Sequence, residues 1–351
     1  MNFGRLPKDL QATLKDVYHP MEGTLNNPKS RLDCIYIDDA RSSLGQLTSN
    51  SVNLSVWSPP YFVGKEYEEY LDFTGWKSLL SEVIRAHFRI LCPGGFLAIN
   101  IADILVFRDE DMPKIQADVV HRKKISLTKE DIVNYLGDNP NARRQEIAAH
   151  FNCSEQTIDR RLNGNNIRGG KSQVQTRVKI VGGLIEKFAL DAGLYTYDRR
   201  IWAKDAAWEN SRWASLSYRS VDEFEYIYIF WKPGVTKYDR KRLTSKEWKE
   251  WGSRGVWNFP SVRANDNHSA KFPSELPRRL IQMFTDPKDV VLDCFLGSGT
   301  TAYTAKAMDR SFIGIELDEK YAMLAASNIQ KKTGFKPQLI KDDNKPSHIT
   351  Q

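Results

Sequence analysis

The segment Val290-Val-Leu-Asp-Cys-Phe-Leu-Gly-Ser-Gly-Thr-Thr-Ala302 carries the strongest fold signal in this chain. It predicts an apolar strand, a tight glycine turn and the start of a helix. Gly297 and Gly299 let the backbone approach a ligand where a Cβ atom would clash. Their spacing to Ala302 fits the fingerprint of a dinucleotide-binding turn. The segment therefore predicts a ligand site at the end of a strand in an α/β fold.

Two side chains beside the glycines indicate which ligand this turn accepts. Asp293 would repel a pyrophosphate but attract a cationic amino-acid group, and Phe295 adds an aromatic ring. Glu316 ends the next predicted strand and offers oxygens to two ribose hydroxyls. S-adenosyl-L-methionine carries an ammonium and a ribose but no phosphate, so it suits this site better than NAD. A plain strand–helix turn is the alternative.

Strands and helices alternate on both sides of this segment. Helix 76–91 has one apolar face at spacings of three and four residues, and Cys92-Pro-Gly-Gly95 is expected to end it. Such alternation predicts an α/β fold with a parallel sheet covered on both faces. The other predicted helices are 181–190 and 274–284, and the strands are 32–37, 52–57, 96–101, 195–202, 225–231, 289–292 and 311–315.

Composition narrows the class of protein. The 351 residues suggest two domains, and the net charge of +7 favours a polyanionic partner. The four cysteines are scattered, so neither a zinc site nor a disulfide framework is expected, and no other metal site is indicated. No apolar run approaches the ~20 residues of a membrane helix, and the first residues do not form a signal peptide. We expect a cytoplasmic protein without a membrane partner.

A polar, basic stretch interrupts the alternation at 112–179. Within it, a threonine-capped helix 129–136, a helix 142–151 and a serine-capped helix 155–162 are predicted. The last two, joined by a short turn, are typical of a helix-turn-helix whose third helix enters the major groove. A helical hairpin that only braces the catalytic domain is the alternative. The residues expected to point outward from the third helix are Gln156, Asp159, Arg160 and Arg161.

A second motif, Trp57-Ser-Pro-Pro-Tyr-Phe62, ends the predicted strand 52–57. Pro60 has no N–H, so it cannot draw the Pro59 carbonyl into a ladder bond. That carbonyl and the Ser58 hydroxyl are then two acceptors for the hydrogens of an amine, and Tyr61 offers a ring for stacking. Read alone, the motif could be a simple turn.

Taken together, the two motifs resemble the amino-methyltransferases of DNA, in the circularly permuted (beta) class where the catalytic motif precedes the cofactor motif. The resemblance covers most of 31–101 and 180–330. It includes Ile37-Asp-Asp-Ala40, the Pro93-Gly-Gly95 turn and His268-Ser-Ala-Lys-Phe-Pro-Ser-Glu-Leu276. Cys294 departs from the family, in which proline usually follows the acid. The resemblance implies a Rossmann-like, circularly permuted sheet for S-adenosyl-L-methionine-dependent transfer, with an inserted helix-turn-helix-like subdomain.

Site residues follow from the resemblance. It implies that Ser58, Pro59, Pro60 and Tyr61 act on a base flipped out of the duplex. The cofactor residues it implies are Asp39, Phe272, Pro273, Asp293, Phe295, Gly297, Gly299, Thr300, Thr301 and Glu316. The residues expected to contact double-stranded DNA are Gln156, Arg160, Arg161, Lys241 and Arg242.

The same resemblance predicts a division of the chain. We expect an arm at 1–30, a catalytic half at 31–111, the insert at 112–179 and a continuation at 180–231. A DNA target-recognition segment is expected at 232–267, the cofactor-binding half at 268–330 and a polar tail at 331–351.

The implied activity is site-specific methylation of cytosine N4 in DNA, in a bacterial or archaeal restriction–modification system that can include a cognate endonuclease. Serine in the first position of the catalytic motif favours N4-cytosine over N6-adenine, which stays the alternative. Cytosine C5 chemistry is rejected because no cysteine nucleophile follows a proline. Three rivals remain open: a DNA-binding regulator on an inactive methyltransferase fold, an NAD oxidoreductase, and methylation of RNA or protein.

Overall fold

The computed structural model describes residues 31–62, 72–113, 126–163, 175–206, 220–262 and 272–341. The chain divides into two compact units. Unit 1 comprises 1–104 and 180–351, and unit 2 comprises 105–179. The predicted arm, the motif residues 268–271 and the last part of the predicted tail lie outside the described residues.

A nine-stranded sheet forms the centre of unit 1, in the order β11-β1-β10-β9-β2-β3-β7-β6-β8. The strands from β11 to β3 are all parallel, whereas β7 runs antiparallel to both β3 and β6. The bounds are β1 Cys34–Ile37, β2 Val52–Trp57, β3 Leu91–Ile101, β6 Tyr195–Ala203, β7 Phe224–Trp231, β8 Val256–Asn258, β9 Val290–Asp293, β10 Ser311–Glu316 and β11 Gln338–Lys341.

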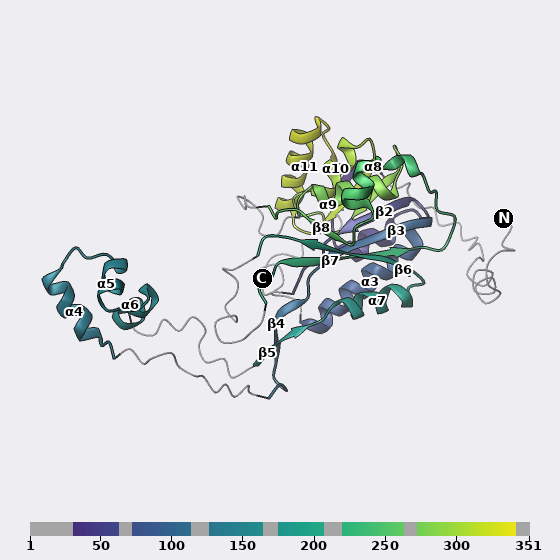
Figure 1. Cartoon of the computed structure of the whole chain (residues 1–351). Coiled ribbons are helices and arrows are strands. Elements are labelled where there is room, and N and C mark those ends of the chain that lie inside the picture. Colours follow the sequence, from purple (N-terminus) through teal and green to yellow (C-terminus); the bar gives the residue numbers. More distant parts are fainter. Residues whose placement is uncertain are drawn as a thin grey trace. The chain divides into compact units, whose positions relative to one another are not determined.

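Helices cover both faces of this sheet, which confirms the predicted α/β class. Helices α9 (Glu275–Phe284), α10 (Thr300–Ala307) and α11 (Glu319–Thr333) lie on one face, and α3 (Phe73–Ile90) and α7 (Gly182–Asp191) lie on the other (Figure 1). Helix α2 (Ala40–Gln46) packs against α3. The predicted apolar face of α3 is buried, and its buried residues include Leu80, Val83, Ile84 and His87. None of the helices in the described residues is long and apolar enough to span a bilayer.

Two segments differ from the sequence-based expectation. Cys92–Gly95 is not a cap after the helix, because α3 ends at Ile90 and β3 begins at Leu91. The predicted polar tail contributes β11, which pairs in parallel with β1. The described part of the predicted recognition segment, 232–262, belongs to unit 1, and Trp251 and Trp257 lie in the core that α9 helps to form. Its other elements are η3 (Arg240–Arg242), α8 (Ser245–Glu247) and η4 (Trp248–Gly252).

Outside 114–125 and 164–174, which are not described, unit 2 contains a two-stranded sheet and three helices. The strands are β4 (Ile104–Asp109) and β5 (Gln175–Lys179), and the helices are α4 (Lys129–Asp138), α5 (Arg144–His150) and α6 (Glu155–Leu162). Thr128 caps α4 through a capping box with Asp131, and Ser154 caps α6, as predicted. The three helices enclose a small core of their own, made of Leu127, Ile132, Ile147, Ala148 and Ile158.

The order of the strands creates a topological switch point in unit 1, the position at which open α/β sheets have a crevice. β9 and β2 are parallel neighbours, but the chain leaves β9 through α10 toward β10, and it leaves β2 through α3 toward β3. Ligands of open α/β sheets bind outside the carboxyl ends of strands where the connections diverge in this way. The two motifs singled out in the sequence lie at the carboxyl ends of these two strands.

Candidate active site

The two motifs are far apart in the chain but adjacent in the sheet. Leu54 and Ser55 of β2 pair with Val291 and Leu292 of β9. Beyond the paired residues, the rings of Trp57 and Phe295 meet edge-on, with centroids 5.3 Å apart. The Ser58–Tyr61 corner and the Asp293–Gly299 loop therefore border the same crevice.

Backbone conformation explains the glycines of the loop. Gly297 and Gly299 have φ of 52° and 85°, in the left-handed region that favours glycine. A Cβ at Gly299 would lie 3.0 Å from Cβ of Ala325, so space is also limited there. The Gly297 amide donates to Oε2 of Glu316 at 2.7 Å, and Oε1 of Glu316 accepts from the Asp318 amide at 3.0 Å. Glu316 thus fixes the loop.

Two carboxyl groups lie at this end of the crevice: Asp293 is buried and Glu316 is half-buried. Asp293 is only 2% exposed, and burial raises its pKa to about 7, although its carboxylate accepts a hydrogen bond from the Phe295 amide. Burial also raises the pKa of Glu316, whose charge in turn opposes ionisation of Asp293. A buried acid of this kind is stabilised as a carboxylate by a cation brought beside it. These carboxylate acceptors fit the ammonium and ribose hydroxyls of S-adenosyl-L-methionine, which donate hydrogen bonds.

The other predicted cofactor residues surround this loop to different degrees. Thr300 and Thr301 are buried in the first turn of α10. Phe272 is half-buried against the core next to Pro273, just before α9. Asp39 follows β1 and caps α2, and both of its carboxylate oxygens are bonded to Arg41. Although burial would raise the pKa of Asp39, Arg41 holds it below the usual value.

Hydrogen bonds hold the catalytic corner in one shape. The Ser58 hydroxyl lies 2.9 Å from the Asn100 carbonyl and 2.7 Å from the Tyr61 hydroxyl. The indole N–H of Trp76 in α3 donates to the Pro60 carbonyl at 2.7 Å. Pro59 is buried and Ser58 is half-buried. The corner is therefore fixed from both sides, by β3 and by α3.

Tyr61 makes a contact that the sequence did not predict. Its hydroxyl donates to Oε2 of Glu225, on the antiparallel strand β7, at 2.6 Å. The Asn100 amide donates to the same carboxylate at 2.6 Å and to the Tyr61 hydroxyl at 2.9 Å. Burial, together with the charge of Glu225, raises the pKa of Tyr61 well above its ordinary value, so the phenol stays a neutral donor.

A lysine completes this network. Nζ of Lys204 lies 2.7 Å from Oε1 of Glu225 and 3.1 Å from Asp222. Although burial opposes its charge, the two carboxylates raise the pKa of Lys204. Sequence reasoning missed these residues, yet a signal exists: Asn100 is a lone polar residue between Ile99 and Ile101 in a buried strand. Buried polar residues in apolar strands need partners, and such partners mark functional or specificity-determining sites.

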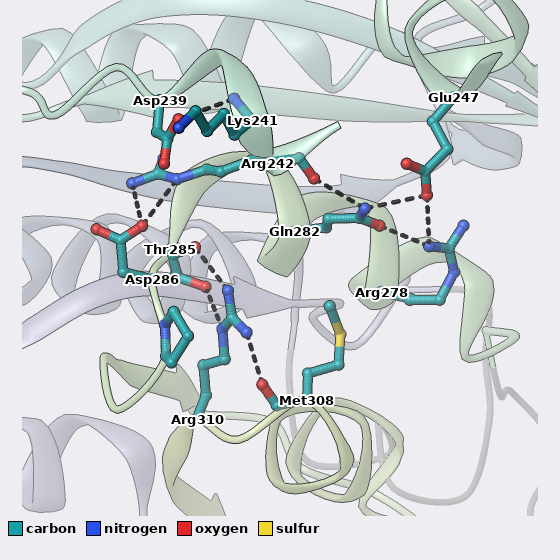
Figure 2. Close-up of a pocket in the computed structure, with 11 residues that line it drawn as sticks. Asp239, Lys241, Arg242, Glu247, Arg278, Gln282, Thr285, Asp286, Met308 and Arg310 are labelled. Carbon is teal, nitrogen blue, oxygen red and sulfur yellow. Dashed lines mark hydrogen bonds and ion pairs between the residues drawn. The ribbon is translucent and has the colours of Figure 1, made fainter. Parts of the chain in front are cut away.

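The predicted DNA contacts in 232–267 have unequal surroundings. Arg242 is ion-paired with Asp286 at 3.0 Å and donates to the Met283 carbonyl, so its side chain acts as a brace, whereas Lys241 is exposed. Arg242 lines a groove of about 600 Å³. In this groove Gln282 donates to the Arg242 carbonyl, and Arg310 donates to the Thr285 carbonyl (Figure 2). Thr285 and Arg310 precede β9 and β10, so the groove lies at the opposite end of these strands from the glycine loop.

In unit 2, the predicted outward residues of α6 have different environments. Gln156, Arg160 and Arg161 are exposed. Asp159 is ion-paired with Arg144 of α5 at 2.7 Å, which ties the two helices together. The turn between them contains Asn152 at a φ of 48°, a left-handed residue that reverses the chain within a few residues.

Comparison with known proteins agrees with this geometry. The model of the N6_N4_Mtase family, described as DNA methylase, matches residues 52–327. The type II methyltransferase M.BglI of Bacillus subtilis is 56% identical over 292 residues, which are 83% of this chain and 84% of that protein.

Two solved structures share the fold. TTHA0409 of Thermus thermophilus, complexed with S-adenosyl-L-methionine, has a TM-score of 0.58 and 25% identity over 89% of this chain and 99% of that chain. PvuII DNA methyltransferase, cytosine-N4-specific, has a TM-score of 0.56 and 16% identity over 89% of this chain and 95% of that chain.

Proposed function

The chain belongs to the N6_N4_Mtase family of DNA methylases, and from that membership we propose that it transfers a methyl group to the exocyclic N4 of a cytosine flipped out of DNA. S-adenosyl-L-methionine is the cofactor, and when bound it supplies the methyl group as a sulfonium. One observation supports the proposal above all others. The Ser58–Tyr61 corner and the Asp293–Gly299 loop end neighbouring parallel strands at the point where the strand connections diverge.

The residues at one end of the crevice would bind and orient the cofactor. The Asp293 carboxylate would hold the ammonium, and Glu316 would accept hydrogen bonds from the ribose while its bond from the Gly297 amide keeps the loop in place. Phe295 and Thr300 would line the methionine end, Asp39 would lie near the adenine, and the segment at Phe272 would border the cofactor. The chain's contribution here is mainly position, which can account for a large share of the barrier to a two-substrate reaction.

The Ser58–Tyr61 corner would bind the target base and orient its exocyclic amine. The lone pair of an exocyclic amine is delocalised into the ring, so the amine is a poor nucleophile. The Ser58 oxygen and the Pro59 carbonyl accept its two hydrogens and favour a tetrahedral nitrogen. Tyr61 offers its ring to the flipped base, which needs a new stacking partner after leaving the duplex.

Serine at position 58 supports cytosine N4 as the acceptor. Its hydroxyl is held by the Asn100 carbonyl and the Tyr61 hydroxyl, as expected for a residue whose oxygen must face an amine. N6-adenine is the alternative acceptor, because the same corner serves either exocyclic amine.

We further propose that unit 2 contributes to the recognition of DNA. A three-helix body with its own core, a tight left-handed turn before α6, and exposed Gln156, Arg160 and Arg161 fit a helix-turn-helix placed in a major groove. Lys241 adds a phosphate contact from the segment 232–267. The context would be a bacterial or archaeal restriction–modification system with a cognate endonuclease, in the cytoplasm.

The test uses the purified chain, double-stranded DNA of mixed sequence and cofactor labelled on its methyl group. We expect label in DNA, and N4-methylcytosine after digestion to nucleosides and mass spectrometry. Ser58→Ala is the matched control, because it removes one acceptor and should leave cofactor binding intact. N6-methyladenine instead would establish the alternative, whereas label only in RNA or protein would refute DNA as the substrate.

A further inference from the structure

Behind the catalytic corner lies a buried polar network for which the family motif gives no role. It comprises Tyr61, Asn100, Lys204 and Glu225, in addition to Ser58. Glu225 is 7% exposed and Asn100 is 1% exposed. Each oxygen of Glu225 has a partner: Oε1 accepts from Lys204, and Oε2 accepts from Tyr61 and Asn100. Burying a charge is expensive unless it is paired in this way, so the network needs a reason beyond packing.

The chemistry of the end groups sets the direction of the hydrogen bonds. A carboxylate only accepts, and an amide –NH2 group only donates. The Tyr61 hydroxyl must therefore give its hydrogen to Glu225 and accept from Asn100. Both neighbours of the Ser58 hydroxyl, the Asn100 carbonyl and the Tyr61 oxygen, are then acceptors. The single hydrogen of Ser58 points inward, and its two lone pairs remain able to accept.

Glu225 also determines how the Asn100 side chain is turned. Within the described part of the chain, the buried Asn100 Oδ1 has no hydrogen-bond partner. Rotating the amide by 180° would leave one of its polar atoms without a partner. It would also place Oδ1 where Nδ2 now lies, 2.6 Å from the Glu225 carboxylate, and the two oxygens would repel each other. The carboxylate thus holds both donors in one orientation.

We propose that Glu225 is a positioning residue for methyl transfer: its carboxylate fixes the hydrogen bonds of Tyr61 and Asn100 so that the Ser58 oxygen meets the target amine only as an acceptor. The proposal rests on the proposed function, because it assumes that an exocyclic amine is the substrate. Lys204 holds the carboxylate in place, and Glu225 itself does not touch the base.

Glu225→Gln is the sharpest change. Lys204 would retain the amide oxygen, so the –NH2 group would face Tyr61 and reverse the direction of its hydrogen bond. Tyr61→Phe keeps the ring for stacking and removes the hydroxyl through which Glu225 acts. Asp222→Asn is the matched control, since Asp222 contacts Lys204 but neither Tyr61 nor Asn100 in the hydrogen bonds described.

The measurement is single-turnover methyl transfer to DNA with both substrates saturating, beside cofactor affinity and melting temperature. We expect Glu225→Gln and Tyr61→Phe each to slow transfer roughly 10- to 100-fold, as misplacement of a reacting group does, without change in cofactor affinity. The double variant should be no slower than the slower single variant, because both changes break the same interaction. Asp222→Asn should transfer at nearly the wild-type rate.

The outcomes separate the two proposals. Wild-type transfer to an amine of DNA with full-rate Glu225→Gln and Tyr61→Phe would overturn the role of Glu225 and leave the proposed function standing. Additive losses in the double variant would also overturn it, since Glu225 would then act other than through Tyr61. If Glu225→Gln does not fold, Tyr61→Phe alone decides by its rate. A wild-type chain that methylates no DNA amine would overturn both proposals.

Discussion

The indole of Trp57, the last residue of β2, packs edge-on against the ring of Phe295, which follows β9. This contact joins the strand that carries the catalytic corner to the strand that carries the cofactor loop. A buried histidine holds the indole in place. Nε2 of His87 accepts a hydrogen bond from the Trp57 indole N–H at 3.3 Å and lies 2.9 Å from the Ser55 hydroxyl. Nδ1 of His87 lies 2.7 Å from the Val83 carbonyl and is therefore the protonated nitrogen.

The first prediction concerns acid sensitivity from His87. Burial lowers its pKa from 6.5 to about 4, so the fold requires the neutral ring. Its contribution is fully present above pH 6.5 and is lost as the pH falls toward 4, because the unfolded chain binds the proton first. As the pH falls from 6.5 to 4, protonation of this histidine in the unfolded chain should lower the free energy of unfolding by roughly 3 kcal/mol.

Comparison with His87→Gln isolates this effect. Glutamine can still accept from the Trp57 indole but does not titrate. The variant should be less stable at pH 7, and its deficit should shrink as the pH falls to 4. Urea unfolding at several pH values measures the difference, and a deficit that stays constant with pH would contradict the prediction.

The second prediction concerns the pH dependence of cofactor binding. Asp293 has a pKa of about 7 in the free site, raised mainly by burial. The cofactor ammonium favours the carboxylate, so binding below pH 7 must release a proton. Cofactor affinity should fall about tenfold for each pH unit below 7 and level off above it, as one linked proton requires.

Calorimetry in buffers of different ionisation enthalpy would detect that proton directly. Asp293→Asn should bind more weakly and lose the pH dependence between 5 and 7. A pH dependence that persists in Asp293→Asn would assign the linked proton to another group, with Glu316 as the nearest candidate.

How far the sequence predicts this site depends on the range of the interactions involved. Asp293, the glycines and the Ser58–Tyr61 corner were identified because each motif encodes its own local turn, and strand alternation predicted a parallel sheet. The contact between Tyr61 and Glu225 follows from the pairing of β7 with β3, which no local pattern records. Arg242 was expected to contact DNA, but its partner Asp286 precedes a distant strand.

The tryptophans of 232–267 show the same limit. The segment was expected to recognise DNA, yet Trp257 is 1% exposed and Trp251 is 5% exposed, and the guanidinium of Arg279 in α9 lies 5.2 Å from both ring centroids. Aromatic residues beside arginines fit either a binding surface or a core, and only the position of α9 decides between them.

The third prediction follows from that burial. Trp257→Ala should cost about 3–5 kcal/mol in the free energy of unfolding, as the loss of a large buried side chain does. Trp248 in the same segment is 52% exposed, and Trp248→Ala, the matched control, should change stability by no more than about 0.5 kcal/mol. Denaturant unfolding measures both. Full stability in Trp257→Ala combined with lost DNA binding would instead make Trp257 a DNA contact.

The fourth prediction tests unit 2 as a DNA-reading element. Arg160 and Arg161 are exposed in the last turn of α6, where each can neutralise one phosphate. Replacing both with alanine should weaken DNA binding and reduce the slope of log affinity against log salt by up to about 2, close to 0.9 per phosphate. Cofactor affinity should not change, because the cofactor residues lie in unit 1. Binding titrations at several salt concentrations measure the slope.

A change in sequence preference distinguishes recognition of bases from simple attraction to phosphates. Gln156 is exposed near the start of α6, the part of a recognition helix that meets base edges. Gln156→Ala should lose about 1–3 kcal/mol of discrimination at one position of the target while the salt slope stays the same. Lys129 is an exposed charge at the start of α4, and Lys129→Ala is the control for Arg160 and Arg161. If DNA reading is confined to α6, Lys129→Ala should leave the target sequence unaffected. If deletion of 125–168 leaves footprint, salt slope and target sequence unchanged, unit 2 is a brace and recognition belongs to unit 1 alone.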